Sequence, residues 1–166
     1  IALAKQCEEL GYARFWVSEH HNHPTIVGTA PEIMMAAIAQ STSHIRIGSA
    51  GVMLPHYAPF KVAEQFRVLD AIAPGRIDLG LGRAPGSDQK TAYAMNPNAG
   101  QDAEHFPANV RDLMAWVMNE PLIDGHPHSG LIAHPKSETS PDVWMLGTSD
   151  YGAQVAAHFG VPYCFA

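Results

Sequence analysis

The sequence predicts an α/β protein built on a parallel sheet, and two observations carry this prediction. Short apolar runs of four or five residues recur along the 166-residue chain without clean polar alternation, which is typical of strands buried on both faces. A helical pattern separates each run from the next, and this order favours parallel strands joined by crossover helices. Five such strands fit either an open doubly wound sheet or part of an eight-stranded barrel.

Each helix has a recognisable start or stop. Gly11 terminates the first helix, and Thr29 and Glu32 have capping-box spacing around Pro31, which suits the first turn of the second. The predicted helices cover residues 1–10, 31–40, 59–73, a segment around 110–117, and 150–159. The predicted strands cover residues 15–17, 45–49, 77–81, 143–146 and 161–165. Residues 82–101 and 126–141 are rich in turn-forming residues and are predicted to be irregular surface segments.

Composition excludes several classes of partner. The net charge of −6 disfavours binding to nucleic acid or to anionic membranes, and no apolar run reaches the roughly 20 residues that span a bilayer. Cys7 and Cys164 lie far apart in apolar segments, so we expect them to be small buried hydrophobes in a reducing cytoplasm. Because the chain starts at Ile1 inside a helical pattern, we expect a single domain over residues 1–166 that is truncated at both ends.

Unusual residues follow four of the predicted strands, at the edge where parallel α/β folds carry their chemistry. Thr148 and Ser149 begin a helix, where hydroxyls and free N–H groups can bind an anion or simply cap the helix. Arg83 stands among small residues and suits either a phosphate contact or a surface ion pair. These residues, together with those at the two other strand ends described next, predict a site for a planar, phosphate-bearing cofactor.

The two remaining strand ends offer a flat surface and a base. Ser49-Ala50-Gly51 could lie against a ring, although a tight strand exit also requires small residues. Glu19-His20-His21 supplies two imidazoles and a carboxylate, for acid–base work or for hydrogen-bonded polar packing. His21 and His23, like His126 and His128, also form H-x-H pairs that keep a metal-dependent hydrolase open as an alternative.

Four segments of the sequence resemble the bacterial-luciferase-like family of flavin-dependent monooxygenases. They are FWVSEHH at 15–21, GSAGVMLP at 48–55, AEQFRVLDAIAPGRIDLGLG at 63–82 and WMLGTS at 144–149. The resemblance implies a partial (β/α)₈ TIM barrel in which the five strands correspond to strands two to six of the family. It also implies FMN bound at the carboxyl ends of the strands.

The resemblance assigns roles to individual residues. His20 matches a histidine near the reactive edge of the flavin, with Glu19 and His21 as supporting catalytic candidates. Ala50 and Gly51 match a small pair that packs against the flavin ring and often contains a cis peptide bond. Arg83, Thr148 and Ser149 match contacts to the FMN phosphate. No metal is implied.

The implied reaction is oxygenation of a small organic substrate by O₂, with reduced FMN supplied by a separate NAD(P)H-dependent flavin reductase. True luciferases carry an acidic residue at the position of Thr148, so the resemblance implies oxygenation of an organic substrate and leaves light emission open. Relatives that use the deazaflavin F420 keep a hydride-transfer oxidoreductase open, and a non-catalytic flavin-binding protein is a further alternative. The resemblance further implies a cytoplasmic enzyme that forms homodimers through helices near the second and third strands.

Overall fold

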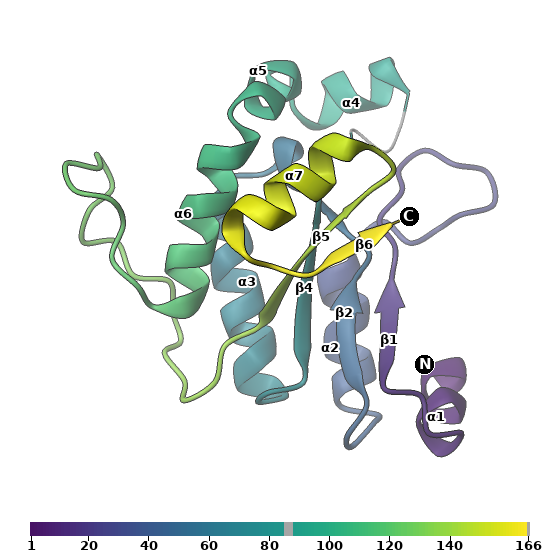
Figure 1. Ribbon diagram of the computed structural model, residues 1–166. Coiled ribbons are helices and arrows are strands. Elements are labelled where there is room, and N and C mark those ends of the chain that lie inside the picture. The colour runs from purple at the N-terminus through teal and green to yellow at the C-terminus, as the bar shows by residue number, and fades with distance from the viewer. Residues whose placement is uncertain (85–87, 166) are drawn as a thin grey trace.

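The computed structural model describes residues 1–84 and 88–165. Helices and strands alternate, and all five strands predicted from the sequence are present (Figure 1). The helices are α1 (Ala2–Glu9), α2 (Pro31–Ala39), α3 (Pro59–Ile72), α4 (Gln89–Met95), α5 (Ala99–Glu104), α6 (Phe106–Met118) and α7 (Asp150–Phe159), with a 3₁₀ turn η1 (Leu54–His56). The strands are β1 (Arg14–Val17), β2 (Arg46–Ser49), β3 (Val52–Met53), β4 (Ile77–Gly82), β5 (Asp142–Gly147) and β6 (Tyr163–Phe165).

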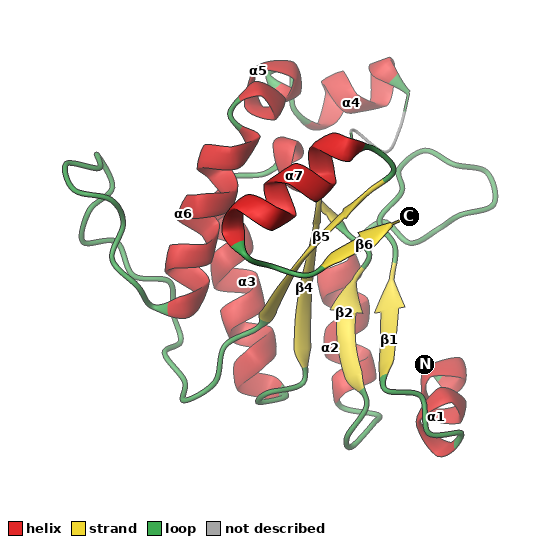
Figure 2. Ribbon diagram, viewed as in Figure 1, coloured by secondary structure: helices red, strands yellow, loops and turns green. Residues whose placement is uncertain are grey.

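The strands form one parallel sheet in the order β1-β2-β4-β5-β6, and the two-residue β3 pairs beside the upper part of β4. The sheet is a half-barrel with the helices packed around it, as expected for part of a (β/α)₈ barrel (Figure 2). β1 and β6 are its two edges within the described residues. Because all strands run the same way, their carboxyl ends gather along one edge, the upper one in Figure 1.

The side chains of the sheet divide into two sets by alternation along each strand. The helix-facing set is apolar and forms the core with α2, α3 and α6; it includes Ile47, Ile77, Leu79 and Leu81, each 0% exposed. The other set faces the inside of the curved sheet and is polar and aromatic. No helix among the described residues is long and apolar enough to cross a membrane.

Asp78 is the centre of the inward-facing set and is fully buried. It accepts hydrogen bonds from Trp16 Nε1 at 2.8 Å, Arg14 Nε at 3.1 Å and Arg46 Nη2 at 2.7 Å. Adding a Cβ atom at Gly48 would place it 2.6 Å from the Trp16 ring, so glycine there makes room for the indole. The buried charge is therefore compensated by side chains from the neighbouring strand β2 and from β1 beyond it.

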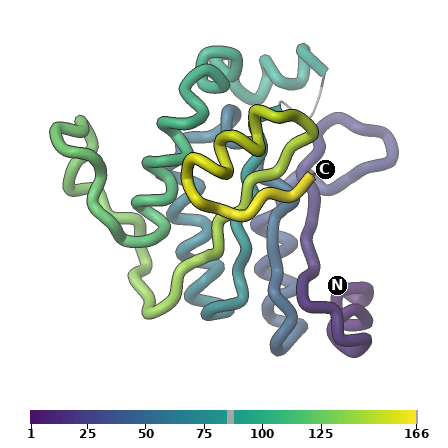
Figure 3. The backbone as a smooth tube through the Cα atoms, in the orientation of Figure 1, coloured from purple at the N-terminus to yellow at the C-terminus, as the bar shows by residue number. Residues whose placement is uncertain are grey.

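Helix α3 carries a second buried pair of charged side chains that the sequence patterns did not reveal. Arg67 and Asp70 are both 0% exposed and together fasten the irregular segment before β5. Arg67 donates to backbone carbonyls of Val117, Pro135 and Thr139, whereas Asp70 accepts from the hydroxyls of Ser137 and Thr139. The segment between α6 and β5 is irregular as predicted and extends outward beside α6 (Figure 3). These contacts attach its end to the core.

Several local predictions are confirmed and others are wrong. Gly11 and Gly160 follow their helices at φ of +81° and +65°, which suits glycine. The capping box is wrong: Ala30 is the N-cap of α2 and makes no side-chain cap bond. Pro31 disfavours a helical conformation for the preceding residue, and Ala30 is non-helical at φ −142° and ψ 79°, so the helix begins one residue later than Thr29 requires. Cys7 and Cys164 are free but only half-buried, not fully buried as predicted.

The predicted irregular segment 82–101 is wrong in its second half, which contains α4 and the start of α5. Asp88 caps α4 by accepting a hydrogen bond from the backbone N–H of Thr91 at 3.0 Å. This cap stabilises a short helix inside a stretch whose composition favours turns. Residues 85–87 of that segment lie outside the described residues.

Candidate active site

Every site residue predicted from the sequence follows the carboxyl end of a strand, along the upper edge of the half-barrel in Figure 1. The residues form two groups. One lies at the exits of β1 and β2 and the other at the exits of β4 and β5. The first group is Glu19, His20, His21, Ala50 and Gly51, and the second is Arg83, Thr148 and Ser149.

Glu19 is the best-anchored residue of the first group and is only 4% exposed. Its Oε1 atom accepts hydrogen bonds from His21 Nε2, at 2.9 Å, and from the hydroxyl of Tyr57. Its Oε2 atom accepts a bond from the backbone N–H of Met53 at 3.0 Å. The carboxylate thus joins the exit of β1 to the segment that follows β2.

His20 differs from its neighbour in having a free ring. Its backbone N–H donates to Gly28 O at 2.8 Å, which fixes the main chain at this point. The half-buried imidazole makes no hydrogen bond to any residue within 1–84 and 88–165. A ring held by its backbone but uncommitted at its nitrogens can take up or release a proton on a bound molecule.

The Ala50–Gly51 peptide bond is cis, as the family resemblance implies. Ala50 lies directly beside the end of β1, because its N–H donates to Val17 O at 2.7 Å. At Gly51 a Cβ atom would lie 2.8 Å from Gly80 O, so the strands approach too closely there for any side chain. The tight strand exit therefore accounts for the glycine. It also leaves a surface of small residues at the mouth of the half-barrel, which is the edge where the carboxyl ends of the strands gather.

The second group brings Arg83 to the start of α7. The guanidinium carbon lies 4.0 Å from the ring centroid of Tyr151, in the first turn of that helix. Arg83, Thr148 and Ser149 are all exposed, and Ser149 is the N-cap without a side-chain cap bond. The guanidinium thus lies at the first turn of the helix that Thr148 and Ser149 precede, and an arginine, hydroxyls and a helix N-terminus are the kinds of donor that bind a phosphate. Asp150, also in the first turn, opposes this field.

The histidine pairs of the metal-hydrolase alternative are engaged elsewhere. His21 is bound to Glu19, and His23 Nδ1 accepts from the backbone N–H groups of Thr25 and Ile26 at 3.2 and 3.1 Å. His126 Nε2 is paired with Asp112 at 3.0 Å, far along the chain on the segment after α6. Among the residues that the structure describes, no group of three or more His, Cys, Asp or Glu side chains could hold a metal ion.

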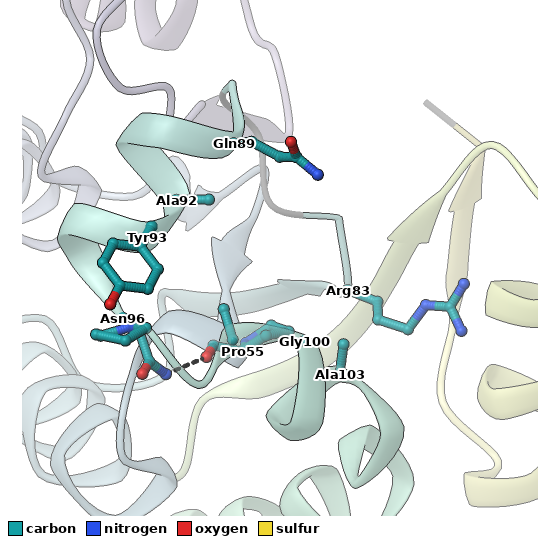
Figure 4. Close-up of a pocket in the computed structure, with 10 residues that line it drawn as sticks. Pro55, Arg83, Gln89, Ala92, Tyr93, Asn96, Gly100 and Ala103 are labelled. Carbon is teal, nitrogen blue, oxygen red and sulfur yellow. Dashed lines mark hydrogen bonds between the residues drawn. The ribbon is translucent and has the colours of Figure 1, made fainter.

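A cavity of about 490 Å³ opens beside the second group, between the stem of Arg83 and the helices α4 and α5 (Figure 4). Asn96 donates to Pro55 O at 2.8 Å across its floor, and the guanidinium of Arg83 points away from α4. The lining is largely apolar, and its polar groups besides Arg83 are two side-chain amides and the phenol of Tyr93. It consists of Pro55, Arg83, Gln89, Ala92, Tyr93, Asn96, Pro97, Ala99, Gly100 and Ala103. The sequence reading missed it because α4 and α5 were expected to be irregular.

The parallel half-barrel with its surrounding helices defines part of a (β/α)₈ barrel, and sequence comparison identifies the family. The chain belongs to the luciferase-like monooxygenase family, whose model matches residues 1–166. It is 47% identical over its full length to the uncharacterized protein YwcH of Bacillus subtilis and covers 50% of that protein. It is 42% identical to the N-acetyl-S-alkylcysteine monooxygenase of Bacillus subtilis, again over its full length and over 49% of that protein. The chain therefore spans about half the length of the relatives it matches.

Solved structures agree with the fold. The crystal structure of apo-MsnO8 superposes with a TM-score of 0.86 and 38% identity, over 99% of this chain and 46% of that one. At 19% identity, where only the fold is informative, two further structures match. They are the FMN complex of the oxygenating constituent of 3,6-diketocamphane monooxygenase from Pseudomonas putida, with a TM-score of 0.77, and an F420-dependent secondary alcohol dehydrogenase, with a TM-score of 0.70. Each covers 99% of this chain, which covers 50% and 52% of those chains respectively.

Proposed function

We propose that the protein containing this chain is an FMN-dependent monooxygenase that uses reduced FMN and O₂ to oxygenate a small organic substrate. The observation that carries this proposal is the position of Arg83. Its exposed guanidinium lies over the ring of Tyr151 in the first turn of α7, the helix that Thr148 and Ser149 precede, and it has no carboxylate partner among the described residues. Arginine at a helix N-terminus is suited to a phosphate monoester such as that of FMN.

The residues of the mouth divide the work. Arg83, Thr148 and Ser149 hold the phosphate, and Ala50 and Gly51 offer a surface without side-chain bulk for the flavin ring. Reduced FMN, when bound, supplies the electrons that activate O₂. His20 takes up and returns a proton at its uncommitted ring, while Glu19 and His21 support it from the same strand exit. The chain's own contribution is to bind, orient and transfer protons.

The proposal is tested by measuring cofactor binding and oxygen transfer with the full-length protein. FMN should quench the protein fluorescence with higher affinity than F420, and ¹⁸O₂ supplied with reduced FMN should label the product. Reduced FMN comes from an NAD(P)H-dependent flavin reductase, which we place with this protein in the cytoplasm. Preferred binding of F420 with hydride transfer would indicate an F420-dependent oxidoreductase instead. Flavin binding without turnover would indicate a non-catalytic flavin-binding protein. Stoichiometric bound metal would support the metal-dependent hydrolase.

The outer face of α2 and α3 supports a homodimer of the full-length protein. An apolar groove of about 490 Å³ runs between the two helices. Large apolar side chains beside it are exposed: Ile33 at 67%, Val68 at 47%, Met34 at 41% and Ile72 at 39%. Contiguous apolar surface of this kind marks a contact with another protein surface. Light scattering should report a dimer that Ile33→Asp with Val68→Asp converts to a monomer; a wild-type monomer would contradict the proposal.

A further inference from the structure

Tyr57 is a residue of the mouth to which neither the strand-end motifs nor the family resemblance assigns a role. It follows the 3₁₀ turn η1, two residues beyond the GSAGVMLP segment. The residue is 37% exposed, but its hydroxyl is turned inward and donates a hydrogen bond to Glu19 Oε1. The same oxygen accepts the bond from His21 Nε2. One buried carboxylate oxygen thus joins a phenol and an imidazole from different strand exits.

Glu19 is completely supplied with donors. Burial of a carboxylate is unfavourable unless hydrogen bonds replace its hydration, and three donors do so here: Tyr57, His21 and the Met53 N–H. Burial, followed by the hydrogen bond to Glu19 and the negative charge of Glu19, raises the pKa of Tyr57 far above its ordinary value. The phenol is consequently neutral throughout the physiological range and is a permanent donor.

The shared carboxylate also fixes the state of the histidine. An ionised carboxylate only accepts hydrogen bonds, so the Nε2 atom of His21 must carry a hydrogen. The proton that His21 gains and loses is then the one on Nδ1. A carboxylate that orients an imidazole in this way determines its tautomer and its readiness to accept a proton.

We propose that Tyr57 is a positioning residue of the site, which acts through Glu19 to hold His21 in the Nε2–H tautomer and to moderate its affinity for a second proton. Its hydroxyl donates a hydrogen bond to the Glu19 carboxylate. Without this bond, the negative charge of Glu19 would attract the second proton of His21 more strongly. The contribution of this arrangement to turnover rests on the proposed monooxygenase function, whereas the arrangement itself does not.

The proposal makes two variants act in opposite directions. In Tyr57→Phe the carboxylate loses a donor, so its charge attracts the His21 proton more strongly. In Glu19→Gln that charge is gone, so His21 binds its second proton more weakly. The titratable groups around the pair are Glu19 itself, His20 and His23 on the same loop, Glu32 on α2, whose negative charge acts on Tyr57, and His56, whose ring centroid is 6.4 Å from that of Tyr57.

The experiment follows the His21 ring by NMR in the full-length protein labelled with ¹³C,¹⁵N-histidine, as a function of pH. The midpoint of its titration should move up by about half a unit or more in Tyr57→Phe and down by at least as much in Glu19→Gln. The ¹⁵N shifts of the unperturbed protein should report the Nε2–H tautomer. Tyr12→Phe is the matched control, because Tyr12 is 60% exposed at the end of α1, and it should leave the midpoint unchanged.

FMN affinity, measured by fluorescence in the same samples, separates the two proposals. It should change less than about twofold in Tyr57→Phe, since the phenol does not contact Arg83, Thr148 or Ser149, the residues proposed to bind the phosphate. If the His21 titration midpoint shifts in opposite directions in the two variants but the protein does not bind FMN, the proposed monooxygenase function is overturned and the proposed role of Tyr57 stands. Midpoints that stay fixed, or that move together in both variants, would show that Tyr57 only packs. A Tyr57→Phe protein that fails to fold would also overturn the proposal, because positioning requires no such loss.

Discussion

Arg83 and Tyr151 are stacked, with the guanidinium carbon 4.0 Å from the ring centroid, although 68 positions separate them in the sequence. The contact places the end of β4 against the first turn of α7. Because the aromatic face binds the cation without neutralising it, the N–H groups of Arg83 remain available to an anion. The stack therefore orients the arginine before any ligand arrives.

Replacing Arg83 with alanine should weaken FMN binding by roughly 10- to 100-fold, the usual effect of removing hydrogen bonds to a charged group. Arg83→Lys should recover only part of this loss, because lysine lacks the planar fork. Fluorescence titration of the full-length protein gives both affinities. Arg111→Ala, which removes an arginine paired with the neighbouring Asp112, is the control and should bind FMN normally. Equal affinity in all four proteins would remove Arg83 from the site.

His20→Ala should slow substrate oxidation by about 10²- to 10⁴-fold, as expected for loss of a general acid–base group, with FMN affinity preserved. Steady-state rates and FMN titration of the same full-length samples separate the two effects. His128→Ala changes an exposed histidine on the segment after α6 and should leave both unchanged. Undiminished turnover to the same oxygenated product would exclude His20 from the mechanism.

Gly80→Ala should destabilise the fold by about 1–3 kcal/mol or more, through overpacking between β2 and β4. A Cβ atom there would lie 2.1 Å from Ser49 O and 2.7 Å from Leu146 Cδ1, and the first of these is backbone that cannot swing away. Gly100→Ala in α5 is the control, since nothing lies within 4 Å of its Cβ position. It should be neutral or slightly stabilising. Denaturant unfolding of both full-length variants checks the difference, and equal stabilities would contradict the close approach.

Glu8 makes stability depend on pH at the acidic end. Hydrogen bonds from the backbone N–H groups of His44 and Ile45 lower the pKa of Glu8 to about 2, from its ordinary value of 4.5. A depressed pKa means that the folded state favours the ionised carboxylate. Its contribution is therefore complete above about pH 4.5 and is lost as the pH falls towards 2.

The measurement is the thermal midpoint of the wild type and of Glu8→Gln across this range. The wild type should exceed the variant at pH 6, and the two midpoints should converge as the pH approaches 2. The protection of the amides of residues 43–45 against hydrogen exchange, relative to their intrinsic rates at each pH, should fall over the same interval. A constant difference between the two proteins would show that Glu8 is held by something other than its charge.

The order of the helices and strands could be predicted from the sequence because buried strands and helix faces require apolar residues at regular spacing. The run Phe15–Val17 is apolar throughout, and Ile77–Leu81 is interrupted only by Asp78, since their strands face helices on one side and the interior of the half-barrel on the other. Glycines at helix ends were equally informative. The short helices α4 and α5 escaped notice because they bury none of their residues completely and so carry little apolar periodicity.

The sequence also predicted that the residues of the candidate site lie along one edge of the sheet, because a parallel sheet places the carboxyl ends of all its strands on the same edge. What could not be read is which of these residues touch. Arg67 and Asp70 lie among the apolar positions of α3, and their partners 50–73 residues away follow no short spacing. Tyr57 likewise meets Glu19 across 38 positions. Such contacts depend on the path of the chain in three dimensions.

Asp78 has a consequence for how the half-barrel assembles. Its carboxylate is satisfied only when β1, β2 and β4 are neighbours and aligned, because Trp16, Arg14 and Arg46 must all face the same side. Sliding β2 by one residue would turn Arg46 to the helix side and leave a dehydrated negative charge without its partner, a loss of several kcal/mol. The same slip would turn the buried side chain of Ile47 away from the helices, so hydrophobic burial specifies the same alignment. Asp78 thus adds an electrostatic penalty to misaligned arrangements that hydrophobic burial already disfavours.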